Sequence, residues 1–337
     1  MAKEKSEFGL IEWIRGQRKG SGVGIVTDIG DDMAVMQLGE EKVLITTDML
    51  LEGVHFELQE QTRGAKPHPT KKDHERVGQS PTLQRRKASL EEVGYKAMGC
   101  SLSDCAAMAA VPMAAVAAVG LAEKMSMEQA QQLYKGMEKG AERYSCPIVG
   151  GDTTSWNNKL VVNITMLAKP GVRKPVLRSG AQVGDVIMVT GDLGGAIEGK
   201  HLNFTPRVNE ALLLTEMVEV HAMIDISDGL SSDLEHICQE SKVSAEIEAG
   251  KIPVSEAARN KDNPLEAAVH DGEDFELLFC VSKEDGERLM REWEKKSSTR
   301  LSVIGKIEKD SGEHKMYILQ PDGRREVLES KGWEHFK

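Results

Sequence analysis

Apolar residues recur along this chain at two spacings, one typical of helices and one typical of strands. Two capping boxes, Ser89 with Glu92 and Ser126 with Gln129, precede stretches with the helical spacing. The pattern predicts helices at about 7–16, from 89, from 126, near 207–220, near 229–240 and near 284–296. Short apolar runs predict strands within 24–37, 42–50, 146–152, 159–168, 186–195, 221–225 and 275–281, and a final hairpin around 321–323. The strand within 146–152 is expected to break into a turn at its glycines.

Strands and helices alternate, but several neighbouring strands are close enough in sequence to be antiparallel. We therefore expect a mixed sheet and a mixed α/β (α+β) fold rather than a purely parallel sheet. The stretch 169–185 is rich in Pro, Gly and cations and has no long apolar run. We place a domain boundary there, which divides the chain into 1–170 and 171–337. A length of 337 residues also favours two domains.

Composition and charge exclude several classes of protein. The net charge of −11 argues against a general nucleic-acid binder, because such affinity comes from Lys and Arg at phosphates. No run of 18 apolar residues occurs and the N-terminus has no apolar signal core, so we expect no membrane association. The five cysteines form no C-x-x-C pair and lie in apolar or helical surroundings. We expect them to be reduced and buried, and the protein to be cytoplasmic.

A basic segment, 57–88, interrupts this acidic chain. It has eight Lys or Arg, four acidic residues, three prolines and few apolar residues. This composition predicts a mobile loop. The loop is either a solvated surface or a lid whose charge meets an anionic substrate, and the sequence leaves both open.

Aspartate recurs beside Gly, Ser or Thr after predicted strands and within a capped helix. The segments are IGDD (29–32), TTD (46–48), LSD (102–104), GGDTT (150–154) and DISD (225–228). Each alone is more often a cap or an Asx turn than a catalytic group. Together they suggest one cleft, in which carboxylates would repel one another unless divalent cations intervened. Mg²⁺, which binds carboxylates together with phosphates, suits such a cleft.

Other phosphate-binding devices are missing from the sequence. It contains no G-x-x-x-x-G-K-[ST] and no protein-kinase signature set, and VTGDLGG is only half of a dinucleotide fingerprint. It also lacks the G-x-S-x-G nucleophile elbow, so nothing supports a hydrolase. His55, Glu273 and Trp333 are further candidates, although a lone His is usually structural and a terminal Trp usually anchors a tail. On residues alone, the sequence indicates an Mg²⁺-dependent enzyme that handles a nucleotide.

Taken in order, these motifs resemble the thiamine-monophosphate kinases of the PurM-like (aminoimidazole ribonucleotide synthetase-like) ATP-binding superfamily. The matching pieces are IGDDMAV, TTDMLLEGVHF, LSDCAAMAAVP, GGDTT, RSGAQVGDVIMVTGDLGG, IDISDGLSSDL, GEDFELLF and GWEHF. They cover nearly the whole chain apart from 57–88. The resemblance implies a two-domain PurM-like fold with a C-terminal α/β domain, and a homodimer in which the N-terminal sheets of two subunits pair. It also implies that ATP lies in a cleft between the two domains.

The implied reaction is transfer of the γ-phosphoryl group of ATP to thiamine monophosphate, giving thiamine diphosphate and ADP. The resemblance assigns several Mg²⁺ ions to Asp31, Thr46, Thr47, Asp48, Asp104, Asp152, Asp225 and Asp228. It assigns ATP to Gly151, Asp152, Lys174 and Ser227, and the thiamine substrate to His55, Glu273 and Trp333. We expect direct in-line transfer without a covalent catalytic nucleophile, because the acceptor is already an anionic phosphate.

Within the doublet Asp31–Asp32, the resemblance assigns Asp31 to metal-bound phosphate. Successive side chains of an extended segment point to opposite faces, so we expect Asp32 to support the loop unless the turn rotates it inward. Three departures from the family pattern are noted: Ser101 replaces an expected Asn, Lys174 replaces an expected Arg, and 57–88 is an insertion.

Some alternatives stay open. Arg173 and Arg178 are alternatives to Lys174 at the nucleotide. The rival functions are another PurM-like ATP-dependent kinase or synthetase of a metabolite, and a nucleotide-binding protein without catalysis.

Overall fold

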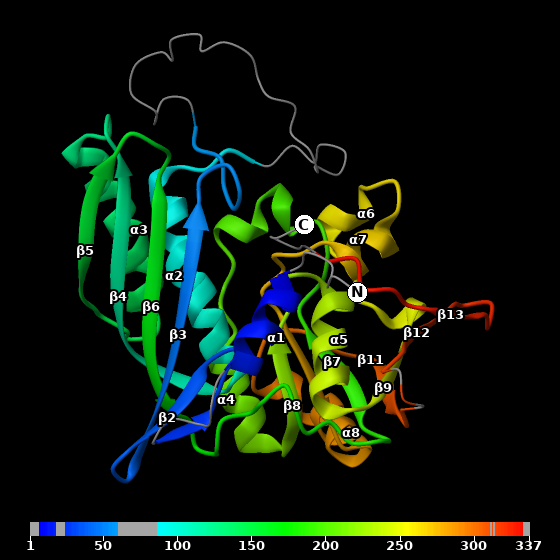
Figure 1. Cartoon of the computed structure of the whole chain (residues 1–337). Coiled ribbons are helices and arrows are strands. Elements are labelled where there is room, and N and C mark those ends of the chain that lie inside the picture. Colours follow the sequence, from blue (N-terminus) through cyan, green and yellow to red (C-terminus); the bar gives the residue numbers. More distant parts are fainter. Residues whose placement is uncertain (1–6, 18–23, 60–85, 311, 313, 333–337) are drawn as a thin grey trace.

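Two β-sheets flanked by helices form the computed structural model, which describes residues 7–17, 24–59, 86–310, 312 and 314–332 (Figure 1). The first sheet has the order β1-β2-β3-β6-β4-β5. Its strands are β1 (Ile25–Thr27), β2 (Ala34–Leu38), β3 (Glu41–Leu51), β4 (Ala110–Ala122), β5 (Ile148–Trp156) and β6 (Val161–Pro170). Neighbouring strands are antiparallel except β4 and β5, which are parallel.

The second sheet has the order β13-β12-β9-β11-β7-β10-β8. Its strands are β7 (Val186–Thr190), β8 (Val220–Asp225), β9 (Ser244–Glu248), β10 (Leu277–Val281), β11 (Leu301–Glu308), β12 (Met316–Leu319) and β13 (Arg325–Val327). Here β9 and β12 are parallel and the other pairs are antiparallel. The prediction of mixed sheets is confirmed.

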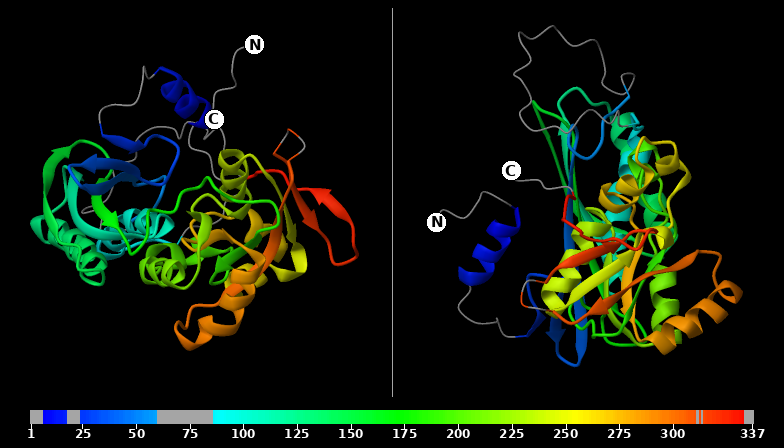
Figure 2. Two further views of the ribbon diagram at one scale, coloured as in Figure 1. Left: turned by 90° about the horizontal axis from the view of Figure 1, so that it is seen from below. Right: turned by 90° about the vertical axis from the view of Figure 1, so that its right-hand side faces the viewer.

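Helices cover one face of the first sheet and surround the second (Figures 1 and 2). The α-helices are α1 (Glu7–Gln17), α2 (Leu90–Ala107), α3 (Met127–Glu142), α4 (Val208–Met217), α5 (Leu230–Ser241), α6 (Glu256–Arg259), α7 (Pro264–His270) and α8 (Lys283–Glu292). Short 3₁₀ turns are η2 (Ala196–Glu198), η3 (Lys200–Leu202), η4 (Ala249–Lys251) and η5 (Trp293–Lys295). Both predicted capping boxes are present, at the starts of α2 and α3. Among the described helices, none has both the length and the apolar character needed to cross a bilayer.

The sequence pattern does not predict three of the strands, and one predicted turn is wrong. The missed strands are β4, β9 and β11. β4 consists mostly of Ala and Val, which give little contrast between its two faces. β5 does not break at its glycines but continues to Trp156. Gly151 instead permits close pairing with β4, since a Cβ there would lie 1.8 Å from the carbonyl oxygen of Ala117.

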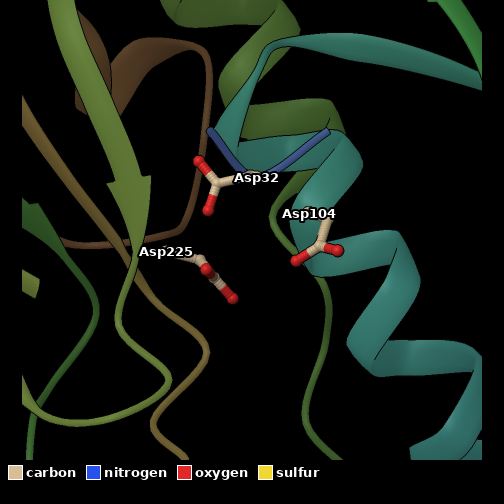
Figure 3. A group of neighbouring side chains, drawn as sticks. All are labelled: Asp32, Asp104 and Asp225. Carbon is tan, nitrogen blue, oxygen red and sulfur yellow. The ribbon is translucent and has the colours of Figure 1, made fainter. Parts of the chain in front are cut away.

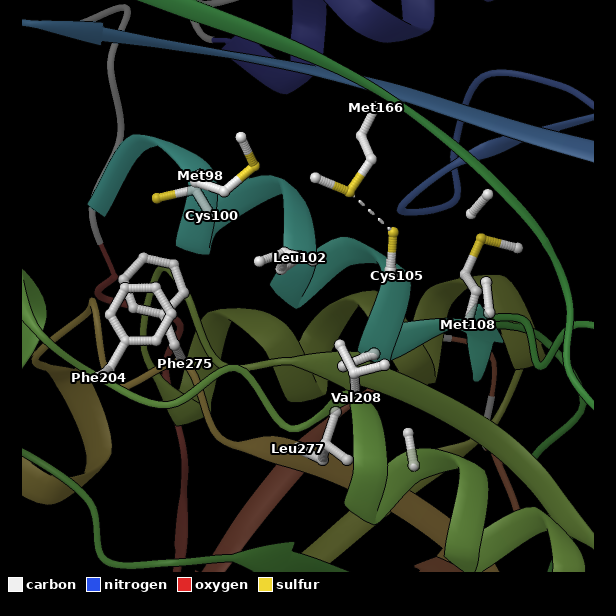
Figure 4. Close-up of a cluster of buried hydrophobic side chains, with 14 of the residues drawn as sticks. Met98, Cys100, Leu102, Cys105, Met108, Met166, Phe204, Val208, Phe275 and Leu277 are labelled. Atoms are coloured by element: carbon white, nitrogen blue, oxygen red, sulfur yellow. Dashed lines mark hydrogen bonds between the residues drawn. The ribbon is translucent and has the colours of Figure 1, made fainter. Parts of the chain in front are cut away.

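Helix α2 lies in the core and packs on elements from both halves of the chain, including β6, α4 and β8. Most of its residues are buried, so the helix is enclosed rather than amphipathic. Figure 4 shows Met98 and Leu102 on α2 beside Phe204 and Phe275, whose rings stack with centroids 4.0 Å apart. One continuous apolar cluster therefore joins the two halves.

The five cysteines are free and buried, as predicted. Cys105 on α2 lies 3.4 Å from the sulfur of Met166 on β6 (Figure 4). They act as small core residues, and burial raises the pKa of each thiol.

Two glycines let α2 and α3 approach until their backbones touch. A Cβ on Gly136 would lie 1.9 Å from the carbonyl oxygen of Glu91, and one on Gly94 would lie 2.0 Å from that of Leu133. No side-chain rotation relieves such clashes, because the opposing atoms belong to the backbone. The helix pair is therefore restricted to glycine at both positions.

We expect Gly136→Ala to lower the free energy of unfolding by about 1–3 kcal/mol, because the helices must separate. Gly16→Ala is the matched control, since a Cβ at Gly16 meets nothing within 4 Å. That substitution should be neutral or should stabilise the protein by up to about 1 kcal/mol. Urea unfolding of both variants checks this, and equal stability of the two would contradict the close packing.

Candidate functional site

Three aspartates from distant parts of the chain converge at one place (Figure 3). They are Asp32, just before β2, Asp104, in the last turn of α2, and Asp225, at the end of β8. One carboxylate oxygen of each lies within 4.8 Å of those of the other two. Such a set of hard oxygen ligands fits a divalent cation of the Mg²⁺ type.

Hydroxyl groups orient the carboxylates around this centre. Ser103 donates a hydrogen bond of 2.5 Å to Asp225, and Thr46 donates one of 2.5 Å to Asp104. Ser101 likewise donates one of 2.5 Å to Asp48. Since Ser101, Ser103 and Asp104 all belong to α2, this helix fixes most of the acidic site.

The Asp31–Asp32 doublet is arranged differently from the expectation. Asp31 accepts a hydrogen bond of 2.8 Å from the backbone amide of Arg178, and therefore orients the loop. Asp32 faces the centre, where its Oδ1 lies 2.7 Å from the Arg178 guanidinium. Its Oδ2 is buried and has no hydrogen-bond partner among the described residues. The turn has thus rotated Asp32 inward, and this orphaned oxygen supports the fit of a cation.

Burial and mutual repulsion favour the protonated forms of these carboxyls. Burial raises the pKa of Asp31 and of Asp48 to about 6. Burial, followed by repulsion from Asp32, raises the pKa of Asp225 to about 7. The pKa of Asp104 is raised well above its usual value, first by burial and then by Asp48. A bound divalent cation would reverse these shifts by replacing protons with a more concentrated positive charge.

Other predicted residues lie elsewhere. Thr47 shares the outer face of β3, away from α2, with its cross-strand neighbour Thr165, and their hydroxyls are 2.9 Å apart. Gly151 and Asp152 lie on edge strand β5, three strands from β3, or about 14 Å across a sheet. Asp152 is exposed and accepts a hydrogen bond from the amide of Thr153. Within one chain, these residues are not brought to the centre of Asp32, Asp104 and Asp225.

The loop between β8 and α5 holds the predicted residues Ser227 and Asp228. Asp233, in the first turn of α5, accepts hydrogen bonds from the amides of Asp228 and Gly229 and so shapes this loop. Burial, followed by repulsion from Asp228, raises the pKa of Asp233 well above its usual value. The loop also connects to the substrate-side candidates, because the Ser227 carbonyl accepts a 2.7 Å hydrogen bond from the amide of Glu273.

The three cations proposed for the nucleotide differ in their surroundings. Arg173 and Lys174 are exposed in the segment between β6 and β7, whereas Arg178 contacts the acidic site. The substrate-side residues His55 and Glu273 lie together, because Lys96 on α2 contacts both. Trp333 and most of the basic segment 57–88 lie outside the described residues.

The sequence reasoning missed several contributors to this site. They are the inward-facing role of Asp32, its ion pair with Arg178, and the supporting residues Lys96, Ser103 and Asp233. Arg178 itself was predicted only as an alternative contact for the nucleotide. One usable signal was present: charged and hydroxyl residues interrupt a helix that otherwise consists of small and apolar residues. Polar side chains on an enclosed helix must be hydrogen-bonded, and such residues are therefore candidates for a functional site.

Comparison with known proteins places this geometry in a family. The family model "AIR synthase related protein, N-terminal domain" matches residues 30–169, and its C-terminal counterpart matches residues 182–317. The thiamine-monophosphate kinase of Rhodopirellula baltica is 37% identical over 274 residues, which cover 77% of this chain and 78% of that protein. The chain belongs to the thiamine-monophosphate kinase family.

Further members of the thiamine-monophosphate kinase family match over nearly the whole length. The protein of Bacillus subtilis is 30% identical over 336 residues, covering 92% of this chain and 93% of its own. A solved structure described as AaThiL complexed with AMPPCP and TMP has a TM-score of 0.76 and 28% identity, covering 98% of this chain and 97% of that one. The predicted two-domain PurM-like fold is thereby confirmed.

We expect the cation-free protein to lose stability as the pH rises from about 4 to about 7. In this range the folded state keeps protons on Asp31, Asp48 and Asp225, whose pKa values are about 6, 6 and 7, whereas the unfolded chain has lost them. Unfolding then releases protons, so higher pH favours it, and a pKa raised by two units corresponds to roughly 3 kcal/mol for one group.

Urea unfolding in EDTA at about pH 5 and about pH 7.5 measures this effect. Millimolar Mg²⁺ should restore stability mainly at the higher pH, and should restore less in Asp225→Asn. A cation-free stability that increases with pH across this range would contradict the expected protonation.

Proposed function

We propose that this protein transfers the γ-phosphoryl group of ATP to thiamine monophosphate in an Mg²⁺-dependent reaction that yields thiamine diphosphate and ADP. The observation that carries the proposal is the convergence of Asp32, Asp104 and Asp225, two buried carboxylates and one half-buried one, whose oxygens lie within 4.8 Å of one another. The chain that carries these carboxylates belongs to the thiamine-monophosphate kinase family.

The acidic residues would hold the cations, and the reaction would take place between the bound phosphates of ATP and of the acceptor. We propose Asp32, Asp48, Asp104 and Asp225 as the main ligands, with Asp31, Thr46 and Asp228 close to them. Bound divalent cations would neutralise the repulsion between the phosphates of donor and acceptor. The hydroxyls of Thr46, Ser101 and Ser103 hold the carboxylates in place through hydrogen bonds.

No covalent intermediate is needed, because the phosphate group of thiamine monophosphate can attack the γ-phosphorus of ATP directly. That group is largely dianionic near pH 7, so its reactivity does not depend on a strong general base. We therefore propose in-line transfer between the two bound molecules. A phosphorylated protein trapped during turnover would contradict it.

Recognition of the two substrates is proposed at two different sets of residues. The nucleotide would contact Ser227 and either Lys174 or Arg173, together with Gly151 and Asp152 on β5. Arg178 is a weaker candidate for ATP because Asp32 already engages its guanidinium. The thiamine moiety would contact His55, Glu273 and Trp333.

We further propose a homodimer formed through the outer face of the first sheet, in a cytoplasmic protein whose two domains meet near 170. Val116 on β4 lies opposite Thr165, in one row with Thr47, and Met49 and Leu167 are also exposed on β3 and β6. Exposed apolar side chains gathered on one sheet face favour burial against another sheet. Thr47 and Asp152 lie on this face and edge, so their proposed roles depend on the dimer.

An assay of ADP release tests the reaction. With Mg²⁺ and ATP, we expect turnover with thiamine monophosphate and none with thiamine or without an acceptor. Asp48→Asn should lower kcat by at least about a hundredfold, since a fixed electrostatic group in phosphoryl transfer contributes on this scale. The control is Asp262→Asn, which changes an exposed aspartate outside the site and should keep full activity. ADP release without any acceptor would contradict the proposal.

Light scattering after size exclusion tests the dimer. We expect the wild-type protein to have twice the mass of one chain and Val116→Glu to have the mass of a single chain, because a charge would be buried in the interface. Val172→Glu is the control, because Val172 is the same residue type and is even more exposed, but lies after β6, outside the sheet. A wild-type monomer would rule the interface out.

A further inference from the structure

A lysine ammonium lies completely buried at the centre of the molecule. The side chain of Lys96, in the middle of α2, has no exposed surface. Its Nζ lies 2.5 Å from Oε1 of Glu273 and 3.1 Å from the carbonyl oxygen of His55. Burying a charge is costly, and an ion pair in a core is often no more stabilising than apolar residues of the same volume. Stability alone therefore gives little reason for a lysine here.

Each partner of Lys96 belongs to a segment that depends on local constraints. His55 closes a tight turn after β3, in which its Nδ1 accepts a hydrogen bond from the amide of Leu51. Glu273 has a φ of 68°, a left-handed conformation that is uncommon for residues other than glycine. Its amide is bonded to Ser227, in the loop that follows β8. The ammonium thus joins a turn from the first sheet to a strained segment from the second.

The position of Lys96 along α2 relates these segments to the acidic site. Asp104 follows Lys96 by eight residues, which corresponds to about 12 Å along a helix axis. Ser103 follows it by seven residues and so lies on nearly the same side of the helix. One rigid helix therefore sets both the carboxylates at one end and the His55 and Glu273 segments at the other. An extended phosphomonoester with an organic group at its far end matches this arrangement.

We propose that Lys96 is a positioning residue for the phosphate acceptor. Its ammonium fixes the His55 turn and the Glu273 segment relative to each other, and so shapes the end of the site that receives the organic part of thiamine monophosphate. This inference rests on the function proposed above. Lys96 acts through its two partners and has no part in holding ATP or the cations.

Steady-state kinetics of Lys96→Met test the proposal. We expect the KM for thiamine monophosphate to rise about tenfold, with the KM for ATP within twofold and kcat within threefold of wild type. A purely structural role would instead lower kcat by reducing the amount of active enzyme and would leave both KM values unchanged. Either that result or an equal rise in both KM values would overturn the proposal.

Two further variants make the test decisive. Lys261→Met removes a comparable ion pair, Lys261 with Asp271 at 2.7 Å, and should leave the KM for thiamine monophosphate unchanged. If Lys96→Met does not fold, Lys96→Met/Glu273→Gln removes both charges and is compared with Glu273→Gln. The double variant should have the KM for thiamine monophosphate several-fold higher, because the His55 carbonyl has also lost its donor; equal values would overturn the proposal.

The wild-type assay separates the two claims. If the wild-type protein does not phosphorylate thiamine monophosphate, the proposed function fails. If it does, and the KM values of the Lys96 variants do not change selectively, only the role of Lys96 fails.

Discussion

Repulsion among buried carboxylates is the constraint on which this structure depends. Asp32, Asp104 and Asp225 come from three elements and reach one point, where burial and repulsion from neighbouring carboxylates raise the pKa of Asp104 and of Asp225. The surrounding structure offsets this with single contacts: a hydroxyl for each of Asp104 and Asp225 and a guanidinium for Asp32. These contacts orient the oxygens without neutralising the group, and so leave it suited to cations. A tighter set of internal partners would stabilise the fold and remove the site.

Helix α2 contributes both to the packing of the core and to the acidic site, so the geometry of the site depends on how this helix packs. Its glycine is pressed against the backbone of α3, while its serines and aspartate orient the acidic cluster. Because the contact with α3 allows no added atom, the helix is held in one rotation and one axial position. The polar residues farther along the same helix are therefore also held in fixed positions. Function here depends on a packing contact between two backbones.

The sequence allowed the elements with strong local signals to be predicted, and the site only as a set of residue types. Capping boxes marked the starts of α2 and α3 correctly, whereas alanine-rich β4 carried no readable alternation. The acidic motifs identified the segments that meet. They did not reveal which member of the Asp31–Asp32 doublet faces inward, because that depends on Arg178, about 150 residues further along the chain. Likewise, the roles of neighbouring Thr46 and Thr47 separate only once the two faces of β3 are known.

The strand order of the second sheet has a consequence for folding during synthesis. β10 lies between β7 and β8, so β8 has no place in the sheet until β10 has been inserted. Asp225, at the end of β8, can therefore reach its place in the sheet only after residues up to Val281 have left the ribosome. Domains generally fold as units during synthesis, N-terminal first. The first sheet can form early, but a nascent chain carries an incomplete acidic centre until most of its length has been translated.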